Sequence, residues 1–274
     1  MRDFIMQRAN TLKFIVNYHS YGNMFLIPYQ GSDGMNKLTT DQAKIYNEIK
    51  TEAKFPPGMK SGNAKELLNY HANGEASDWA LSKAGIISMS PELASESVTS
   101  YTFDMPSVRE EARVILENLG LPFYLLDKAS PQLEIVASKN KSLKVDVVNR
   151  VIQFEIELEN KGMSDANNLS VSLAFNDAIA QVKGSVVVGT VKARSSKALT
   201  LRLSGISDET LGTLAQIFAM GDFAKDRVGL NVDFVITYDG AAPESSTFYI
   251  PVGLDQLSSS YMVSLMEIET KHGQ

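Results

Sequence analysis

The chain contains no cysteine among its 274 residues, which excludes disulfide bonds and thiolate metal sites. Histidine is scarce as well, with only His19, His71 and His272, so few imidazole ligands are available for a metal. Long apolar runs are also missing, and no stretch approaches the roughly 20 apolar residues of a membrane-spanning helix. We therefore expect no membrane span.

Charge of one sign is nowhere concentrated. The 26 basic residues are scattered among 32 acidic ones, the net charge is -6, and nucleic acid is not expected as a partner because it requires clustered Lys and Arg. The first ten residues include Arg2, Asp3 and Arg8, which would interrupt the apolar core of a signal peptide. We expect no signal peptide in this chain.

The first half of the sequence has the pattern of an α/β fold, and its hydrophobic content of 44% allows one large or two ordinary domains. Residues 11–18 predict a strand covered on both faces, and GIISM at 85–89 predicts another. The spacing of apolar residues predicts helices at about 40–54, 61–69, 79–84 and 107–119, with Val108, Ala112, Ile115, Leu116 and Leu119 facing a core. Gly120 and Pro122 are expected to end the last helix.

Beyond Pro131 the apolar residues recur at every second position, which is typical of half-buried strands. Turn-forming stretches separate these strands at intervals that suit an antiparallel sandwich, with one helical insert near 207–220. We therefore expect an α/β domain over residues 1–128, followed by an all-β antiparallel sandwich of the immunoglobulin or transthyretin kind over 132–268. The alternating positions are Leu143, Val145, Val147; Phe154, Ile156, Leu158; Leu169, Val171, Leu173, Phe175; Leu199, Leu201, Leu203; Leu230, Val232, Phe234 and Ile236.

Three stretches of the first half carry candidate chemistry. They are HSYGNMFLIPY at 19–29, YHANGEASDW at 70–79 and GIISMSPEL at 85–93. Each one alone is a weak signal, but their order and spacing together resemble the zinc carboxypeptidases of the pancreatic and regulatory type. The resemblance implies a partial carboxypeptidase-like mixed sheet with helices, and hydrolysis of C-terminal amino acids from peptides.

By this resemblance, His19 corresponds to the third zinc ligand and Glu92 to the general base. Neutral imidazole binds zinc well, and zinc lowers the pKa of its bound water to about 7, so that a nearby carboxylate can remove the proton. The cofactor implied is therefore zinc, and the expected partners are the C-termini of peptides or proteins. Secretion is expected from the resemblance alone.

The resemblance also implies a set of substrate-binding residues. Ser20 and Tyr21 would line the cleft, and Tyr70 would be the mobile phenol that closes over the bound C-terminus. Ser77 stands at the position that contacts the terminal side chain. Because Ser77 is neither acidic nor bulky and apolar, while Glu75 lies nearby, the preferred C-terminal residue stays open.

The sequence departs from the family at the zinc site. No His-x-x-Glu occurs anywhere, and the family's Asn-Arg pair for the substrate carboxylate, which precedes the third zinc ligand together with a further Arg, has no counterpart before His19. One histidine cannot hold catalytic zinc, so we expect an incomplete and inactive carboxypeptidase fragment. Either the chain is a truncated product of a longer reading frame, or it is a degenerate relative retained for binding. Because Glu92 and Tyr70 persist, we favour truncation.

Simpler interpretations stand beside these. His19 alone would be an ordinary strand-end histidine, Glu92 a solvated carboxylate and Tyr70 a packed aromatic residue. His71 and Glu75 are best interpreted as part of a solvated loop. The alternative functions are a non-catalytic peptide-binding or interaction protein, and a structural sandwich protein with a vestigial first half.

Overall fold

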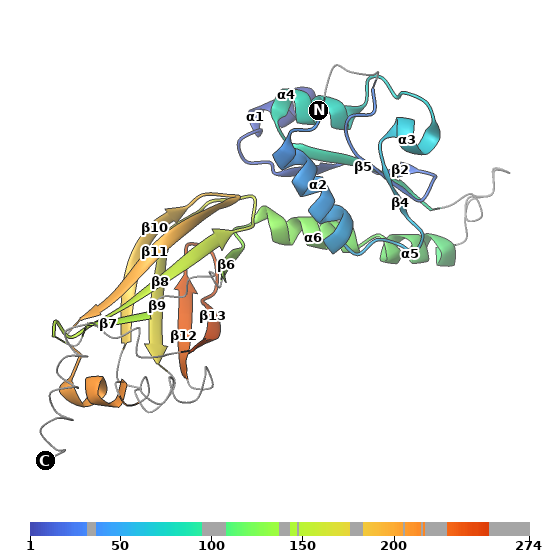
Figure 1. Cartoon of the computed structure of the whole chain (residues 1–274). Helices are drawn as coiled ribbons and strands as arrows, with labels where there is room; N and C mark the ends of the chain where they lie inside the picture. The colour runs from blue at the N-terminus through green and yellow to red at the C-terminus, as the bar shows by residue number, and fades with distance from the viewer. Residues whose placement is uncertain are drawn as a thin grey trace, which may run out of the picture. The chain divides into compact units, whose positions relative to one another are not determined.

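The fold comes from a computed structural model that describes residues 1–31, 37–94, 108–136, 143–146, 148–175, 183–204, 206–214, 216 and 229–251. The chain divides into two compact units, which we call unit 1 (1–129) and unit 2 (130–274) (Figure 1). Among the helices described, none is both long and apolar enough to cross a membrane.

Unit 1 is a mixed α/β structure. Its sheet has the strand order β1-β5-β3-β4, and β2 also pairs with β5. Strands β1 and β2 run parallel to β5, whereas β3 runs antiparallel to it. The predicted α/β class is confirmed for this unit. Its elements are α1 (Arg2–Gln7), β1 (Phe14–Val16), β2 (His19–Ser20), β3 (Met24–Leu26), α2 (Thr40–Glu52), β4 (Lys60–Gly62), α3 (Ala64–Leu68), α4 (Ala76–Ala84), β5 (Ile87–Leu93), α5 (Val108–Glu117) and α6 (Gly120–Ala129).

Local capping explains where the helices of unit 1 begin and end. Helix α2 starts with a capping box in which the Thr39 side chain accepts from the Gln42 backbone, one residue before the expected start. Asn63 caps α3 in the same way. Helix α4 ends at Gly85, whose φ of 69° is the left-handed conformation that glycine adopts readily.

The end of unit 1 differs from the sequence prediction. Gly120 and Pro122 were expected to end the helical region, but a second helix, α6, begins at Gly120. Proline is tolerated there because the first turn of a helix has no internal partner for its backbone N–H. Glycine is required because a Cβ at position 120 would lie 2.0 Å from the Lys54 carbonyl oxygen.

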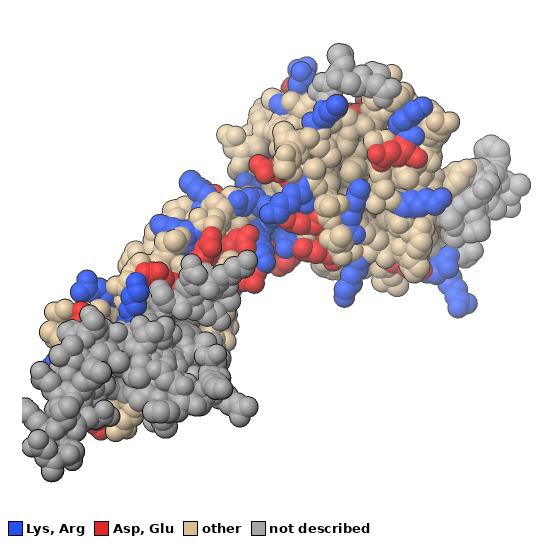
Figure 2. Space-filling model, in the orientation of Figure 1, with Lys and Arg blue, Asp and Glu red and all other residues tan. Residues whose placement is uncertain are grey.

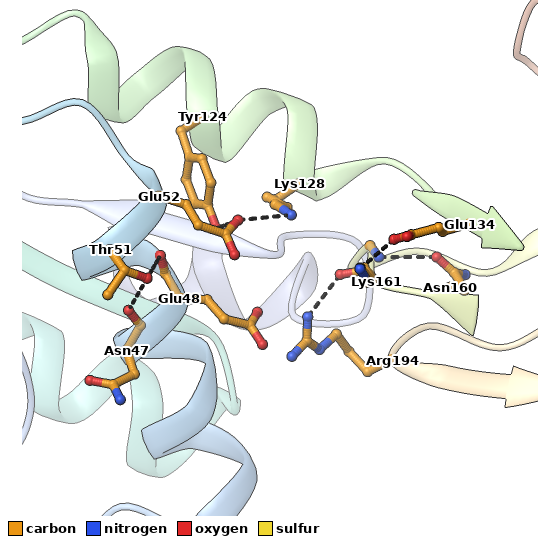
Figure 3. Close-up of polar contacts among 11 residues, drawn as sticks. Asn47, Glu48, Thr51, Glu52, Tyr124, Lys128, Glu134, Asn160, Lys161 and Arg194 are labelled. Carbon is orange, nitrogen blue, oxygen red and sulfur yellow. Dashed lines mark hydrogen bonds and ion pairs between the residues drawn. The ribbon is translucent and has the colours of Figure 1, made fainter. Parts of the chain in front are cut away.

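The predicted core face of α5 is also wrong in part. Ile115 and Leu116 are 60% and 68% exposed, while Leu121 and Leu125 of α6 are buried. Helix α6 is held to α2 by polar contacts around Glu52, which accepts a hydrogen bond from the Tyr124 hydroxyl and forms an ion pair with Lys128 (Figure 3). Tertiary contacts, and not helical spacing, decided which apolar residues are covered.

Unit 2 contains two antiparallel sheets. One has the order β10-β9-β12-β13, and the other has the order β11-β8-β6 with β7 also pairing β8. The five strands predicted from period-two spacing are present, whereas β6, β10 and β13 were not predicted. The elements are β6 (Leu133–Val136), β7 (Leu143–Asp146), β8 (Val151–Asn160), β9 (Ala166–Phe175), β10 (Lys183–Val191), β11 (Ser195–Ser204), β12 (Gly229–Thr237) and β13 (Glu244–Pro251), with residues 208–214 helical.

The two sheets contribute to one hydrophobic cluster. Ile152 and Leu158 of β8 belong to it, as do Val171 of β9 and Phe234 of β12, and each is at most 2% exposed. Alternation along the strands puts these residues on one face of each sheet. The buried side chain of Asn160 forms four hydrogen bonds with the backbone of unit 2. Its Oδ1 accepts from the backbone N–H groups of residues 132 and 162, and its Nδ2 donates to the carbonyls of residues 164 and 191.

Candidate functional site

One face of the strands β1, β2 and β5 is polar toward the carboxyl ends of the strands. The register that pairs Ile15 with Ser88 also pairs His19 with Glu92, and all these strands are parallel. Because side chains alternate along a strand, every second residue returns to the same face. His19 and Glu92 therefore lie side by side. We call this set of side chains the polar face: Asn17, His19, Ser88, Ser90 and Glu92.

The ring of His19 is oriented by its neighbour two residues earlier. Asn17 Nδ2 lies 2.8 Å from His19 Nε2, and the side chain of His19 is otherwise exposed. With Nε2 in contact with Asn17, Nδ1 of His19 is left for another partner. In metal sites, a hydrogen bond to one ring nitrogen sets the orientation of a histidine whose other nitrogen binds the metal. Sequence reasoning identified His19 but not Asn17.

Glu92 has the surroundings of a base. Partial burial raises the pKa of its carboxyl, the neighbouring His19 lowers it, and the negative charge of Glu75 raises it again. The net shift of the pKa is upward. A carboxylate with a raised pKa binds a proton more readily than an ordinary glutamate, which suits a group that removes a proton from water.

Near Glu92, a network of polar side chains joins the loop after β3, the start of α4 and strand β5. Gln30 Nε2 donates to Ser77 Oγ at 3.1 Å, and Ser77 Oγ donates to Glu75 Oε2 at 3.4 Å. Ser90 Oγ of β5 also donates to Glu75 Oε2 at 3.4 Å. Gln30, Ser77 and Ser90 are each 1% exposed. The predicted pocket residue Ser77 is thus in direct contact with Glu75.

Asp78 holds the loop that follows β3. Its carboxylate accepts the backbone N–H of Gln30 at 2.9 Å and that of Gly31 at 2.9 Å. Burial raises the pKa of Asp78, the two backbone hydrogen bonds lower it, and Glu75 raises it, with a net upward shift. These contacts place Gln30 against the buried side of α4.

The other predicted substrate residues lie near the surface. Ser20 pairs with Leu93 next to the His19 and Glu92 pair, and its side chain is exposed. Tyr21 follows directly and is 39% exposed. Tyr70, on the loop between α3 and α4, is 55% exposed. The structure therefore brings His19 and Glu92 together, with Ser20 next to them in β2 but on the opposite face, while Tyr70 lies on a solvent-facing loop.

The described residues do not fit a complete zinc site. Within them, no group of three or more His, Asp or Glu side chains is placed to hold a metal ion. A catalytic zinc site needs three protein ligands, and on the polar face His19 is the single imidazole. A complete zinc site of the kind implied by the resemblance is therefore not formed by the part of the chain that the structure describes.

Basic side chains do not form a patch on the visible surface of unit 1. In the face drawn in Figure 2, the Lys and Arg side chains of unit 1 stand apart from one another and are interspersed with uncharged residues. That face therefore lacks the continuous positive surface that follows a phosphate backbone.

Four residues of the site were missed by sequence reasoning: Asn17, Gln30, Ser88 and Ser90. The signal for Ser90 was present, because Ser88, Ser90 and Glu92 alternate with apolar residues within one strand. Gln30 had no such signal, since its place under α4 depends on the loop conformation that Asp78 imposes.

Comparison with known proteins finds a family similarity for the first part of the chain. Residues 1–113 match the family model described as zinc carboxypeptidase, which is consistent with a partial domain of that family. No curated protein matches the chain by sequence.

Solved structures resemble parts of the chain only loosely. The CARDB domain of a Pyrococcus furiosus protein, described in complex with di-metal ions, is 14% identical over 46% of this chain and 96% of that chain, with a TM-score of 0.26. A protein from Arabidopsis thaliana is 20% identical over 45% of this chain and 85% of that chain, with a TM-score of 0.31. Red sea bream transglutaminase is 16% identical over 54% of this chain and 19% of that chain, with a TM-score of 0.26. At these TM-scores the similarities support no conclusion about this chain.

Proposed function

We propose that unit 1, whose residues 1–113 match the zinc carboxypeptidase family, contributes His19 and Glu92 to the hydrolysis of C-terminal amino acids from peptides. The observation that carries this proposal is the register pairing of His19 with Glu92 at the end of parallel strands. Sites of α/β sheets gather at this edge, because the carboxyl ends of parallel strands meet there.

In this proposal Glu92 accepts a proton from the attacking water at a carboxylate oxygen and later returns it to the leaving amine. Its raised pKa supports the role. Ser20 and Tyr21 would border the substrate, and Tyr70 would approach it from the loop that carries it. We assign no step to zinc, because the described residues do not form a site for it.

The second unit has a supporting role in this proposal. Its two antiparallel sheets would pack as a sandwich, since their buried residues belong to one cluster. The unit would then be a folding or docking module attached to the carboxypeptidase portion, and the protein would act outside the cell on peptide or protein C-termini.

A second candidate function follows from the lack, among the residues that the structure describes, of three side chains placed to hold a metal ion. A chain that holds no zinc could retain the polar face to bind peptide C-termini without cleaving them. This alternative uses the same residues, so an experiment must separate binding from hydrolysis.

The test uses the longest protein that the gene encodes, loaded with zinc, in four forms: wild type, His19→Ala, Glu92→Gln and the control His71→Ala. If the proposal holds, mass spectrometry detects release of C-terminal residues from a mixture of peptides. Loss of the general base in Glu92→Gln is expected to lower kcat about 10² to 10⁴-fold, while His71→Ala stays near wild type.

Full activity of Glu92→Gln would refute the role of this carboxylate. Binding of peptides with a free C-terminus but not of their amidated forms, without zinc and without hydrolysis, would establish the binding alternative. Absence of both hydrolysis and binding would exclude both functions.

A further inference from the structure

The turn before α4 contains the one Asn-Gly dipeptide of the chain, Asn73-Gly74. Both residues are exposed. Gly74 has a φ of 84°, and a Cβ built at this position would meet no atom of the described residues within 4 Å. Glycine has more conformational freedom than other residues, because no Cβ restricts its backbone. The backbone nitrogen of Gly74 therefore has both the space and the freedom to approach the side chain of Asn73.

This arrangement permits a reaction within the chain that needs only water as a co-reactant. The Gly74 backbone nitrogen loses its proton to solvent and attacks Cγ of Asn73. The new N–C bond closes a five-membered succinimide ring, the bond from Cγ to Nδ2 breaks, and the side-chain nitrogen takes up a proton and leaves as ammonia. Water then opens the ring at either carbonyl, which gives aspartate or isoaspartate. A neutral carboxamide thereby becomes a carboxylate.

The Asn73 side chain lies beside Asp78 and the loop after β3. Asn73 Oδ1 is 3.3 Å, and Asp78 Oδ2 is 3.5 Å, from the position that a Cβ at Gly31 would take. The same oxygen of Asp78 accepts the Gly31 backbone N–H at 2.9 Å. One residue before Asn73, the Ala72 backbone N–H donates to the Gln30 carbonyl at 2.8 Å. The turn and the loop are thus joined by contacts that meet at residues 30–31.

We propose that Asn73 is a site of spontaneous deamidation, and that the carboxylate it gains releases the turn from the loop after β3. A charge at position 73 would lie close to the charge of Asp78, and like charges a few ångströms apart repel each other. Burial and the negative charge of Glu75 already raise the pKa of the Asp78 carboxyl, so this group tolerates a further negative neighbour poorly. Isoaspartate would also lengthen the backbone of the turn by one carbon.

The released turn would include the segment that carries Tyr70. This residue is exposed and precedes Asn73 by three positions. In the proposed function Tyr70 approaches the substrate from this segment, so deamidation would weaken the binding of peptide C-termini. That consequence rests on the proposed function, whereas the deamidation and the release of the turn do not.

The first test incubates the full, folded chain at mildly alkaline pH and follows its asparagines by peptide mapping with mass spectrometry. The internal reference is Asn69, which is also exposed but precedes Tyr70 instead of a glycine. We expect Asn73 to deamidate at least about tenfold faster than Asn69, because the side chain of Tyr70 restricts the backbone there. An Asn73 that stays intact for as long as Asn69 would overturn the proposal.

The second test uses Asn73→Asp, which carries the aspartate product from the start. We expect the Ala72 amide to exchange its hydrogen at least about fivefold faster than in wild type, because its contact with the Gln30 carbonyl opens more often. The control Asn69→Asp adds the same charge on the preceding loop and should exchange like wild type. Fluorescence of Trp79 reports whether each variant is folded. Unchanged exchange in folded Asn73→Asp, or equal acceleration in both variants, would overturn the release of the turn.

A titration with benzoylglycyl-phenylalanine tests the consequence for peptide C-termini. We expect Asn73→Asp to bind this probe about threefold or more weakly than wild type, and Asn69→Asp to bind it like wild type. Equal affinity of all three forms would overturn the effect on binding. Failure of wild type to bind the probe would count against the proposed function, while the peptide mapping and the hydrogen exchange decide the deamidation and the release of the turn separately.

Discussion

The hydroxyl of Tyr46 replaces a strand partner inside the sheet of unit 1. Tyr46 is 1% exposed, and its hydroxyl donates to the Ser88 carbonyl at 2.8 Å and accepts from the Ser88 N–H at 3.2 Å. Strand β3 pairs with β5 only from Ser90 onward, so its ladder does not reach Ser88. Burial accordingly raises the pKa of Tyr46 well above its ordinary value.

Tyr46→Phe would remove these two hydrogen bonds while keeping the ring. The apolar surface buried by the ring is unchanged, so the cost comes from leaving one backbone N–H and one carbonyl without a partner. Each unsatisfied buried group costs about 1–3 kcal/mol. Because the two groups belong to one residue and can relax together, we expect the free energy of unfolding of unit 1 to fall by about 2–4 kcal/mol.

Urea titration followed by tryptophan fluorescence measures this change. The only tryptophan, Trp79, lies in unit 1, so its signal reports that unit even if unit 2 unfolds separately. The matched control is Tyr70→Phe, which removes a hydroxyl from an exposed ring and should change stability by less than about 0.5 kcal/mol. A Tyr46→Phe protein as stable as this control would show that the two hydrogen bonds do not support the sheet.

Two further predictions concern unit 2 and pH. Asn160→Ala removes four hydrogen bonds from a buried side chain and should lower the stability of unit 2 by about 3 kcal/mol or more, measured by circular dichroism of its strands; a change below about 1 kcal/mol would contradict this role. The pKa of Glu92 is higher in the folded chain than in the unfolded chain, so protonation of its carboxyl stabilises the fold. This stabilisation is fully present below about pH 4 and is lost as the pH rises through the folded pKa. Glu92→Gln cannot lose this contribution, so its stability relative to wild type should increase from pH 4 to pH 7 in Trp79 fluorescence melts, and a decrease would refute the sign of the shift.

Local patterns predicted most secondary structure correctly. The approximate start of α2, the apolar strand β5 and the period-two strands of unit 2 depend on neighbours close in the chain, so the sequence shows them directly. The strands β10 and β13 were missed because three consecutive valines in one and a run of Ser and Thr in the other break the alternation. Helix α6 was missed because Pro122 and Gly120 ordinarily end a helix.

The sequence by itself determined the candidate pair His19 and Glu92, because both lie in motifs whose order and spacing can be read along the chain. Only the tertiary structure decided that Glu75, Gln30 and Ser90 belong to one hydrogen-bonded network near that pair. They come from a helix start, a loop and a strand that are far apart in sequence, and their contact depends on the packing of α4 against β5 and on the loop held by Asp78. Side-chain contacts of this kind have no signature in the spacing of residues, because packing creates them.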